Sequence, residues 1–146
     1  MFLGQYRHNL DSKGRLTVPA RFRDLLVPEG AYVMQGFDLN LMVLPTSTFD
    51  SISRRVNRMS MTDPKTRLLR RLIFSTANYV EVDRAGRILI PLFLRETAKL
   101  ESGITVVGNG DYFEIWSPEL WDQQIEELQD PLSNADRFEG LILSSD

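Results

Sequence analysis

The sequence predicts an α+β protein, mostly β with short helices, in which two pseudo-symmetric repeats exchange hairpins to close one small barrel. Three observations support this fold class. A turn motif, D-x-x-G-R, occurs at residues 11–15 and again at residues 83–87. Residues 9–50 align without a gap to residues 81–122, at a constant offset of 72. Each repeat has about 45 residues, too few to sustain a core alone without disulfides or metal.

The aligned repeats share eight identical residues, and their apolar residues keep the same phase. The identities are Asp11/Asp83, Gly14/Gly86, Arg15/Arg87, Pro19/Pro91, Arg23/Arg95, Glu29/Glu101, Gly36/Gly108 and Asp50/Asp122. Two separate open sets of strands would leave unpaired edges, and pairing or exchanging hairpins between the repeats would cover them. We therefore expect the two units to fold together around one core.

Each repeat begins with an alternating strand, the D-x-x-G-R turn and a second strand, which together predict a β-hairpin. Pro19 and Pro91 end these second strands and favour a short helix after each, over residues 20–26 and 92–100. Two further strands are predicted in each repeat, at residues 31–36, 39–44, 104–109 and 112–117.

An amphipathic helix is predicted to close each repeat, and another helix should connect the repeats. The apolar positions of the closing helices are Phe49, Ile52, Val56 and Met59 in the first and Leu120, Trp121, Ile125 and Leu128 in the second. Asp63-Pro64 starts the connecting helix. The apolar stripe of that helix is Leu68, Leu69, Leu72 and Ile73.

These elements predict four segments along the chain. They are a first unit at residues 5–51, a helical connector at 52–79, a second unit at 80–123, and a C-terminal helix with an acidic tail at 124–146. After Pro131 the periodicity is weak, so the tail is expected to be a short helix or frayed.

Composition excludes several classes of function. The 146 residues include no cysteine and one histidine, His8, so a disulfide framework, a thiolate zinc site and a cysteine nucleophile are excluded. With no catalytic serine motif and no carboxylates at metal-ligand spacing, we expect no enzyme, no catalytic residue, no metal site, no cofactor and no small-molecule substrate. The sequence has no signal-peptide pattern and no long apolar run, so we expect a cytoplasmic protein without a membrane partner.

Charge is unevenly distributed along the chain. Residues 51–95 carry ten basic and three acidic groups, whereas residues 96–146 carry two basic and twelve acidic groups. A basic zone can meet phosphate, and an acidic end would be repelled by it. The net charge of −3 therefore does not exclude a nucleic-acid partner.

The D-x-x-G-R turn has two interpretations. Asp11 and Asp83 can accept backbone N–H bonds, while Gly14 and Gly86 can take a positive φ. The following arginine then serves either as a structural bridge to the aspartate or as a DNA contact. A bridge needs only one cation, but the turns are surrounded by five: Arg7, Lys13, Arg15, Arg84 and Arg87. Because an arginine fork suits phosphate or guanine, this surplus favours DNA binding, with the first turn as the main contact.

Other candidate sites have simpler explanations. The basic run from Arg54 to Arg71 could be a second phosphate surface, but its helical apolar spacing favours a solvated helix face or a subunit contact. The VGNGD segment at 107–111 resembles a nucleotide loop but lacks the third glycine and aligns with an ordinary turn. His8 is expected to be a partly exposed strand residue.

The segments NLDSKGRLTVPARFR, DRAGRILIP and LIFSTANYVEVD, with the opening MFLGQY and the later VVGNGDYFEIWSPELWDQQ, resemble the MraZ family of bacterial transcriptional regulators nearly end to end. The resemblance implies two SpoVT-AbrB type units in one swapped-hairpin barrel and a ring homo-oligomer. It also implies binding of double-stranded DNA at short, G-containing direct repeats. These repeats would lie upstream of the protein's own operon for division and cell-wall synthesis. The resemblance implies that the protein represses this operon and is associated with the nucleoid.

Carried onto this chain, the resemblance implies Lys13 and Arg15 as DNA contacts, followed by Arg87, with Ala85 opposite Lys13 as a departure. The main alternative is an AbrB-like protein-interaction or antitoxin-type module, in which the acidic tail would bind a protein partner. Basic turn tips favour DNA, whereas the acidic tail favours the alternative.

Overall fold

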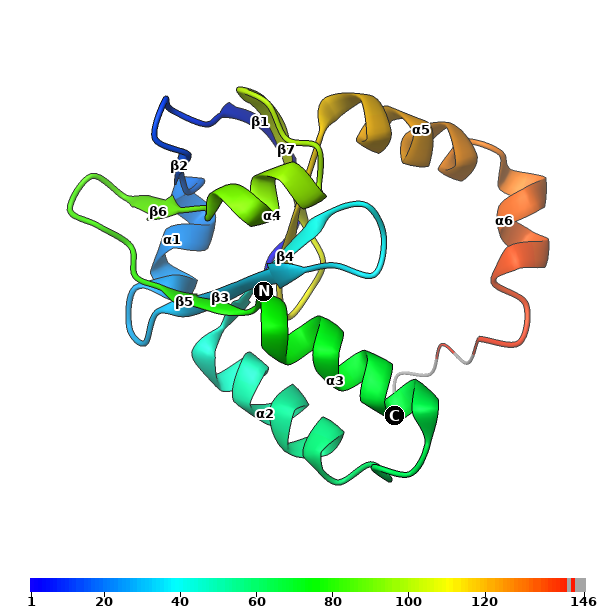
Figure 1. Ribbon diagram of the computed structural model, residues 1–146. Coiled ribbons are helices and arrows are strands. Elements are labelled where there is room, and N and C mark those ends of the chain that lie inside the picture. The colour runs from blue at the N-terminus through cyan, green and yellow to red at the C-terminus, as the bar shows by residue number, and fades with distance from the viewer. Residues whose placement is uncertain (142, 144–146) are drawn as a thin grey trace.

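Over the described part of the chain, residues 1–141 and 143, the computed structural model has eight strands and six helices (Figure 1). The strands are β1 (Gln5–Asn9), β2 (Arg15–Thr17), β3 (Ala31–Gln35), β4 (Leu41–Pro45), β5 (Asn78–Val80), β6 (Arg87–Leu89), β7 (Gly103–Gly108) and β8 (Phe113–Trp116). The helices are α1 (Ala20–Leu26), α2 (Thr46–Asn57), α3 (Pro64–Thr76), α4 (Leu92–Thr97), α5 (Pro118–Leu128) and α6 (Pro131–Arg137).

The strands form one six-stranded sheet, in the order β1-β7-β8-β4-β3-β5, and a separate two-stranded ribbon of β2 and β6. All pairs are antiparallel. Strand β1 of the first repeat pairs with β7 of the second, and β5 of the second pairs with β3 of the first. The same exchange on both sides makes β4 and β8 the central pair of the sheet, about which the repeats are related by a pseudo-twofold axis. The fold class and the duplication predicted from sequence are confirmed.

The predicted hairpin within each repeat extends only a little beyond its turn. In the first repeat, an isolated bridge joins Leu10 to Leu16, and the Asp11 N–H donates to the carbonyl of Arg15 at 3.0 Å. Beyond that point the two strands separate. Strand β1 pairs with β7, with Gln5 opposite Val107, while β2 pairs with β6. Within the described residues the sheet and the ribbon are separate hydrogen-bonded units that share a core, so the barrel is not a continuous ring of paired strands.

Apolar side chains from both repeats fill the space between the sheet and the ribbon. Leu16 and Ile88 point inward from the ribbon and are almost fully buried. They belong to the same cluster as Val43 and Ile115 of the central sheet pair. Because every side of this core comes from both repeats, neither repeat has a complete core of its own.

Pro19 and Pro91 directly precede α1 and α4, as the sequence predicts. Helices α2 and α3 lie side by side at one end of the sheet, over a second buried cluster that includes Phe49 and Ile73 (Figure 1). Two predicted apolar positions in this region are wrong. Helix α2 ends at Asn57, so Met59 lies beyond it and is exposed, and Leu68 faces outward from α3 with 64% of its surface exposed.

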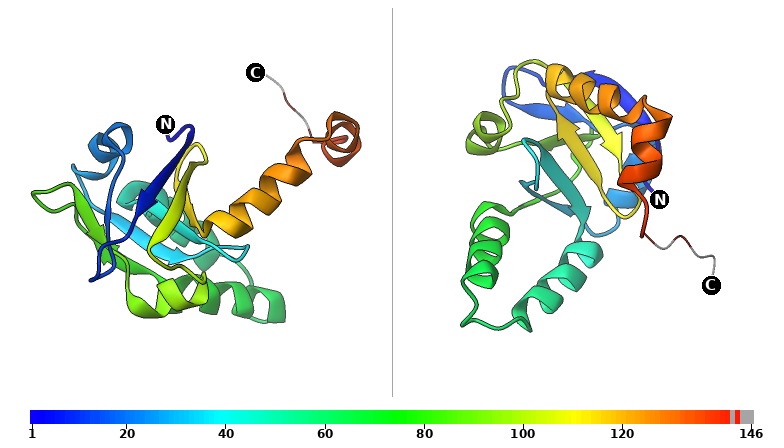
Figure 2. Two further views of the ribbon diagram at one scale, coloured as in Figure 1. Left: turned by 90° about the horizontal axis from the view of Figure 1, so that it is seen from above. Right: turned by 90° about the vertical axis from the view of Figure 1, so that its right-hand side faces the viewer.

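Helices α5 and α6 project from the opposite end of the sheet (Figure 2). Ser117 caps α5 and Asp130 caps α6 through their side-chain oxygens. No residue of either helix is buried, and the predicted apolar position Leu128 is half exposed. The short helix expected after Pro131 is therefore present, whereas residues 142 and 144–146 of the predicted acidic tail lie outside the described residues.

Candidate nucleic-acid interface

The first D-x-x-G-R turn is organised by one carboxylate. Oδ1 of Asp11 accepts the backbone N–H groups of Lys13 and Arg15, each at 2.9 Å. Oδ2 of Asp11 accepts Nε of Arg15 at 2.6 Å. This arrangement fixes the first part of the arginine side chain against the turn, and within the described residues its two terminal nitrogens have no hydrogen bond.

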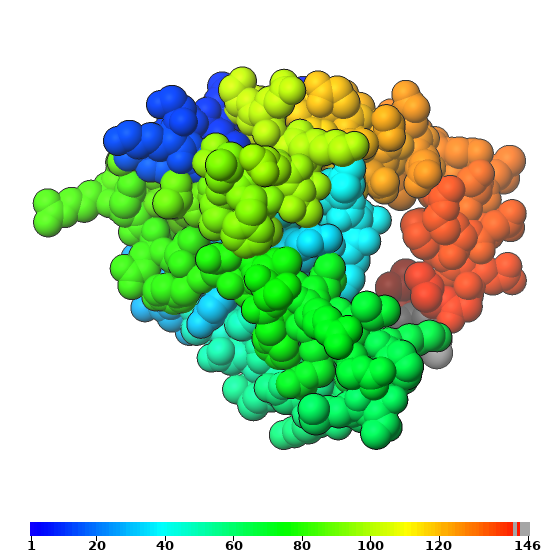
Figure 3. Space-filling view, in the orientation of Figure 1, coloured from blue at the N-terminus to red at the C-terminus, as the bar shows by residue number. Residues whose placement is uncertain are grey.

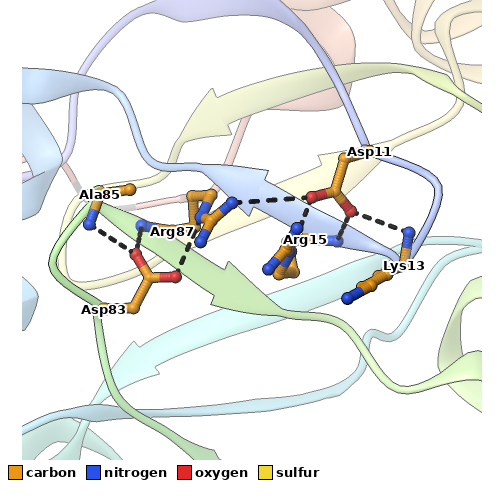
Figure 4. A network of polar contacts seen from close by, with 6 residues as sticks. All are labelled: Asp11, Lys13, Arg15, Asp83, Ala85 and Arg87. Atoms are coloured by element: carbon orange, nitrogen blue, oxygen red, sulfur yellow. Dashed lines mark hydrogen bonds and ion pairs between the residues drawn. The ribbon is translucent and has the colours of Figure 1, made fainter.

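The second turn repeats this geometry. Oδ1 of Asp83 accepts the backbone N–H groups of Ala85 and Arg87, each at 2.9 Å, and Oδ2 accepts Nε of Arg87 at 2.9 Å. Figure 4 shows both turns and one link between them, in which a terminal nitrogen of Arg87 lies 4.0 Å from Oδ2 of Asp11. The two motifs therefore form one polar network rather than two independent turns.

The ribbon brings the two arginines onto one surface. In its register Arg15 lies opposite Leu89 and Thr17 lies opposite Arg87, so the two arginines are diagonal neighbours. Side chains alternate between the faces of a strand, and Leu16 and Ile88 occupy the buried face. The outer face therefore carries Arg15 and Arg87, whose side chains are 31% and 30% exposed.

Two further arginines support the turns from the other repeat, and sequence reasoning did not assign them a role. Arg95 of α4 packs over Gly14, and Arg23 of α1 packs over Gly86. A Cβ at Gly14 would lie 2.5 Å from Cζ of Arg95, and a Cβ at Gly86 would lie 2.6 Å from Cζ of Arg23. The identity Arg23/Arg95 between the repeats was the sequence signal that could have found them.

These arginines also tie the ribbon to its helices. Arg23 donates to the carbonyl of Val18 at 3.0 Å, and Arg95 donates to the carbonyl of Ile90 at 3.0 Å. Gly14 and Gly86 have φ of +82° and +79°, which favours glycine at both positions, and a Cβ at either one would force the guanidinium group over it to shift. The turn of each repeat is thus held in place by an arginine of the other repeat.

Comparison with known proteins identifies the family. The model of the family described as "MraZ protein, putative antitoxin-like" matches residues 1–72 and again residues 73–140. The chain belongs to the MraZ family. A "Transcriptional regulator MraZ" of Roseiflexus castenholzii is 43% identical over 138 residues, which cover 94% of each chain. The protein of the same name from Thermomicrobium roseum is 44% identical over 128 residues, covering 88% of this chain and 89% of the relative.

In this MraZ chain each turn tip carries one more cation. Lys13 and Arg84 are exposed, and neither takes part in an ion pair within the described residues. The second turn is therefore as basic as the first, because Arg84 compensates for Ala85 from one position earlier. Arg7 differs, since it lies on β1 and pairs with Asp122 of α5 at 3.2 Å.

The aspartates of both MraZ turns are strongly favoured as carboxylates. The backbone N–H of Arg15 is the main cause that lowers the pKa of Asp11 to about 2, and the Arg15 guanidinium and the Lys13 N–H add to it. The backbone N–H of Arg87 likewise lowers the pKa of Asp83, with the Arg87 guanidinium contributing. Both turns keep their ion pairs at neutral pH.

The described residues of this MraZ chain include no group of three or more histidine, cysteine, aspartate or glutamate side chains placed to bind a metal ion. Among the described helices, none combines the length and the apolar character needed to cross a lipid bilayer.

Proposed function

We propose that this chain is a transcriptional regulator that binds double-stranded DNA through the outer face of the β2–β6 ribbon. The observation that carries the proposal is the cluster of four cations on that ribbon and its two turns: Lys13, Arg15, Arg84 and Arg87. The naming of close relatives as transcriptional regulators supports the same conclusion.

A two-stranded ribbon fits the major groove of B-DNA, where its outward side chains reach the base edges. Nε of each arginine donates to the aspartate of its own turn. The rotation of the side chain is therefore restricted, and its terminal nitrogens remain for the DNA. A fork of this kind binds O6 and N7 of guanine with two hydrogen bonds. In this scheme Arg15 and Arg87 read bases, while Lys13 and Arg84 contact flanking phosphates. Arg7 adds a peripheral phosphate contact once its exposed ion pair with Asp122 opens.

The finer details of the proposal follow from the family resemblance. The operator is a set of short, G-containing direct repeats upstream of the protein's own division and cell-wall operon, and the consequence is repression of that promoter. A ring of copies would place several ribbons on successive repeats, so that weak individual contacts combine into tight binding. A nucleoid-associated location and the absence of catalysis accompany this role.

A second candidate is a protein-interaction or antitoxin-type module. The C-terminal helices α5 and α6, of which α5 is acidic and neither has a buried residue, favour it, and the family that matches is described as antitoxin-like. This candidate predicts that the C-terminal helices, rather than the ribbon, determine the activity in cells.

The test is binding of labelled upstream DNA to the purified protein across a salt series. The logarithm of affinity should fall with that of salt concentration by roughly 0.9 per neutralised phosphate. Arg15→Ala should lose about tenfold or more in specific affinity, since a bidentate arginine–guanine pair contributes about 1–3 kcal/mol. Arg15→Lys keeps the charge but not the fork, so it should retain non-specific binding only.

The control is Arg21→Ala, which removes an exposed arginine of α1 outside the turns. Circular dichroism and the melting temperature establish that each variant is folded. Wild-type affinity in a folded Arg15→Ala protein would remove Arg15 from the mechanism. An unfolded Arg15→Ala protein would instead support a purely structural bridge between Asp11 and Arg15.

A further inference from the structure

The equivalent helices α2 and α5 carry opposite charge. Near its C-terminal end α2 has Arg54 and Arg55, with Arg58 directly after it, whereas α5 has four acidic residues and no basic one. The acidic residues of α5 are Glu119, Asp122, Glu126 and Glu127. The pseudo-twofold axis places these helices on opposite sides of the molecule, so one protomer presents a basic end and an acidic end.

The basic end is the α2–α3 helix pair, called here the basic helix pair. It holds seven arginine and lysine residues between Arg54 and Arg71, and none of them takes part in an ion pair within the described residues. Leu68 lies at helical spacing between Lys65 and Arg71 on the exposed side of α3. Met61 is also largely exposed. The surface is therefore both cationic and apolar.

The acidic end consists of α5 and α6, called here the acidic arm. The start of the arm is anchored to β1, because Nε1 of Trp121 donates to Gln5 at 2.8 Å and Arg7 pairs with Asp122. Beyond this anchor the arm leaves the body, and Figure 3 shows an open space between α6 and the body of the molecule. Leu132 is 81% exposed, and Phe138 just after α6 is nearly half exposed. The arm is therefore acidic and apolar.

We infer that the acidic arm of one copy docks on the basic helix pair of the next copy. The inference rests on the assembly part of the proposed function and names the surfaces that make the contact. Because the two surfaces are different and lie at opposite ends of a protomer, each copy can bind two neighbours head to tail. Such contacts close into a ring when the rotation between neighbours allows it.

Both the charges and the exposed apolar residues indicate that the partner of each surface is a second copy of this chain. Aligned opposite charges steer the copies together and fix their register, while Leu68 and Leu132 supply apolar area to be buried. A surface built only for DNA phosphate would need the arginines but not an outward leucine between two cations. The ribbon tips lie outside both surfaces, so Lys13 and Arg84 stay free for DNA in the assembled protein.

The experiment uses two full-length variants, each with one apolar and one charged substitution. Leu68→Glu/Arg71→Glu alters the basic helix pair, and Glu127→Lys/Leu132→Lys alters the acidic arm. Arg84→Glu is the charge-reversal control at a ribbon tip. Mass is measured without DNA by size-exclusion chromatography with light scattering, and circular dichroism establishes that each variant is folded.

Wild type and Arg84→Glu should form the same oligomer, whose mass falls as salt is raised, while each surface variant alone should be a monomer. Mixed together, the two surface variants should form a complex containing both chains, because each retains the surface that the other lacks. A monomeric wild type, an unchanged mass in either surface variant, or no complex on mixing would overturn the inference.

A helix-pair variant that keeps its mass but loses DNA binding would assign that surface to phosphate and likewise overturn the inference. Failure of the DNA proposal has a different signature. In that case Arg15→Ala would bind DNA like wild type, whatever the surface variants do to assembly.

Discussion

Asp11 and Asp83 each accept the same three hydrogen bonds in their turns, two of them from the arginine, whereas the equivalent helices α2 and α5 carry opposite charges. The turns sit where the repeats interlock, with Arg95 over Gly14 and Arg23 over Gly86. A change in one turn therefore disturbs a contact made by the other repeat. The helices lie at the outer ends of the fold, and the contacts of α5 with the other repeat, Trp121 with Gln5 and Asp122 with Arg7, lie near the start of that helix. Symmetry is retained in the turns, where each repeat packs on the turn of the other, and the symmetry of charge is lost in the helices.

The largest effect is expected from the glycines of the turns. Gly14→Ala and Gly86→Ala should each lower the free energy of unfolding by about 2 kcal/mol or more, because a left-handed backbone costs roughly 1–2 kcal/mol for other residues and the arginine must also move. Urea unfolding measures the loss.

Gly110→Ala is the matched control for this prediction. Gly110 has φ of +79°, and a Cβ there would meet no atom of the described residues within 4 Å, so this variant carries only the backbone cost. A loss at Gly14 and Gly86 no greater than at Gly110 would mean that Arg95 and Arg23 do not lock the turns. Unequal losses of unfolding free energy at Gly14 and Gly86 would show that the two turns are not equivalent in energy.

An intermediate effect is expected from the cations at the turn tips. Lys13→Ala and Arg84→Ala should weaken DNA binding to a similar extent for all sequences. Each should also reduce the salt slope by about 0.9, the value for one neutralised phosphate. Fluorescence anisotropy with specific and random duplexes measures both the affinity and the slope. If only Lys13→Ala changes the slope, the two turns are alike in structure but not in function.

The smallest effect concerns the aspartates. Asp11 should titrate at a pH of about 2 in the folded protein, and Asp83 below its ordinary value of 3.8. Because both pKa values are lower when the chain is folded, the turns contribute stability that is fully present above about pH 4. This contribution is lost as the pH falls toward 2.

Carboxyl carbon chemical shifts followed by NMR against pH measure these two titrations. In Arg15→Lys the titration of Asp11 should move upward, while that of Asp83 should change little. An Asp11 carboxyl that titrates near 4 in the wild-type protein would contradict the observed turn geometry.

Local structure was largely predictable from the sequence because its causes are local. Pro19 and Pro91 start helices by their fixed φ, Asp63 and Ser117 cap α3 and α5, and alternation marks the longer strands. Strand partners were harder to predict. A D-x-x-G-R turn has the same hydrogen bonds whether its strands stay together or separate, so the sequence did not reveal how short the hairpin is.

Predictions that depend on tertiary packing were less successful. Leu68 is part of an apolar stripe in the sequence. However, α3 packs against the second buried cluster through the face that carries Leu69 and Ile73, and Leu68 points outward. For the candidate site, the turn aspartates and arginines lie together as the motif suggests. The roles of Arg23 and Arg95 were missed because each acts on a turn about 60–80 residues away in sequence, beyond the reach of local patterns.

The exchange of strands also constrains how the chain is made. Strand β1 pairs with β7, so Gln5 has no partner until Val107 has left the ribosome. At a synthesis rate of about 5–20 residues per second, the first strand remains unpaired for several seconds of translation. The nascent chain therefore depends on delayed pairing between distant segments, which makes folding slow and leaves early intermediates open to aggregation or chaperone binding.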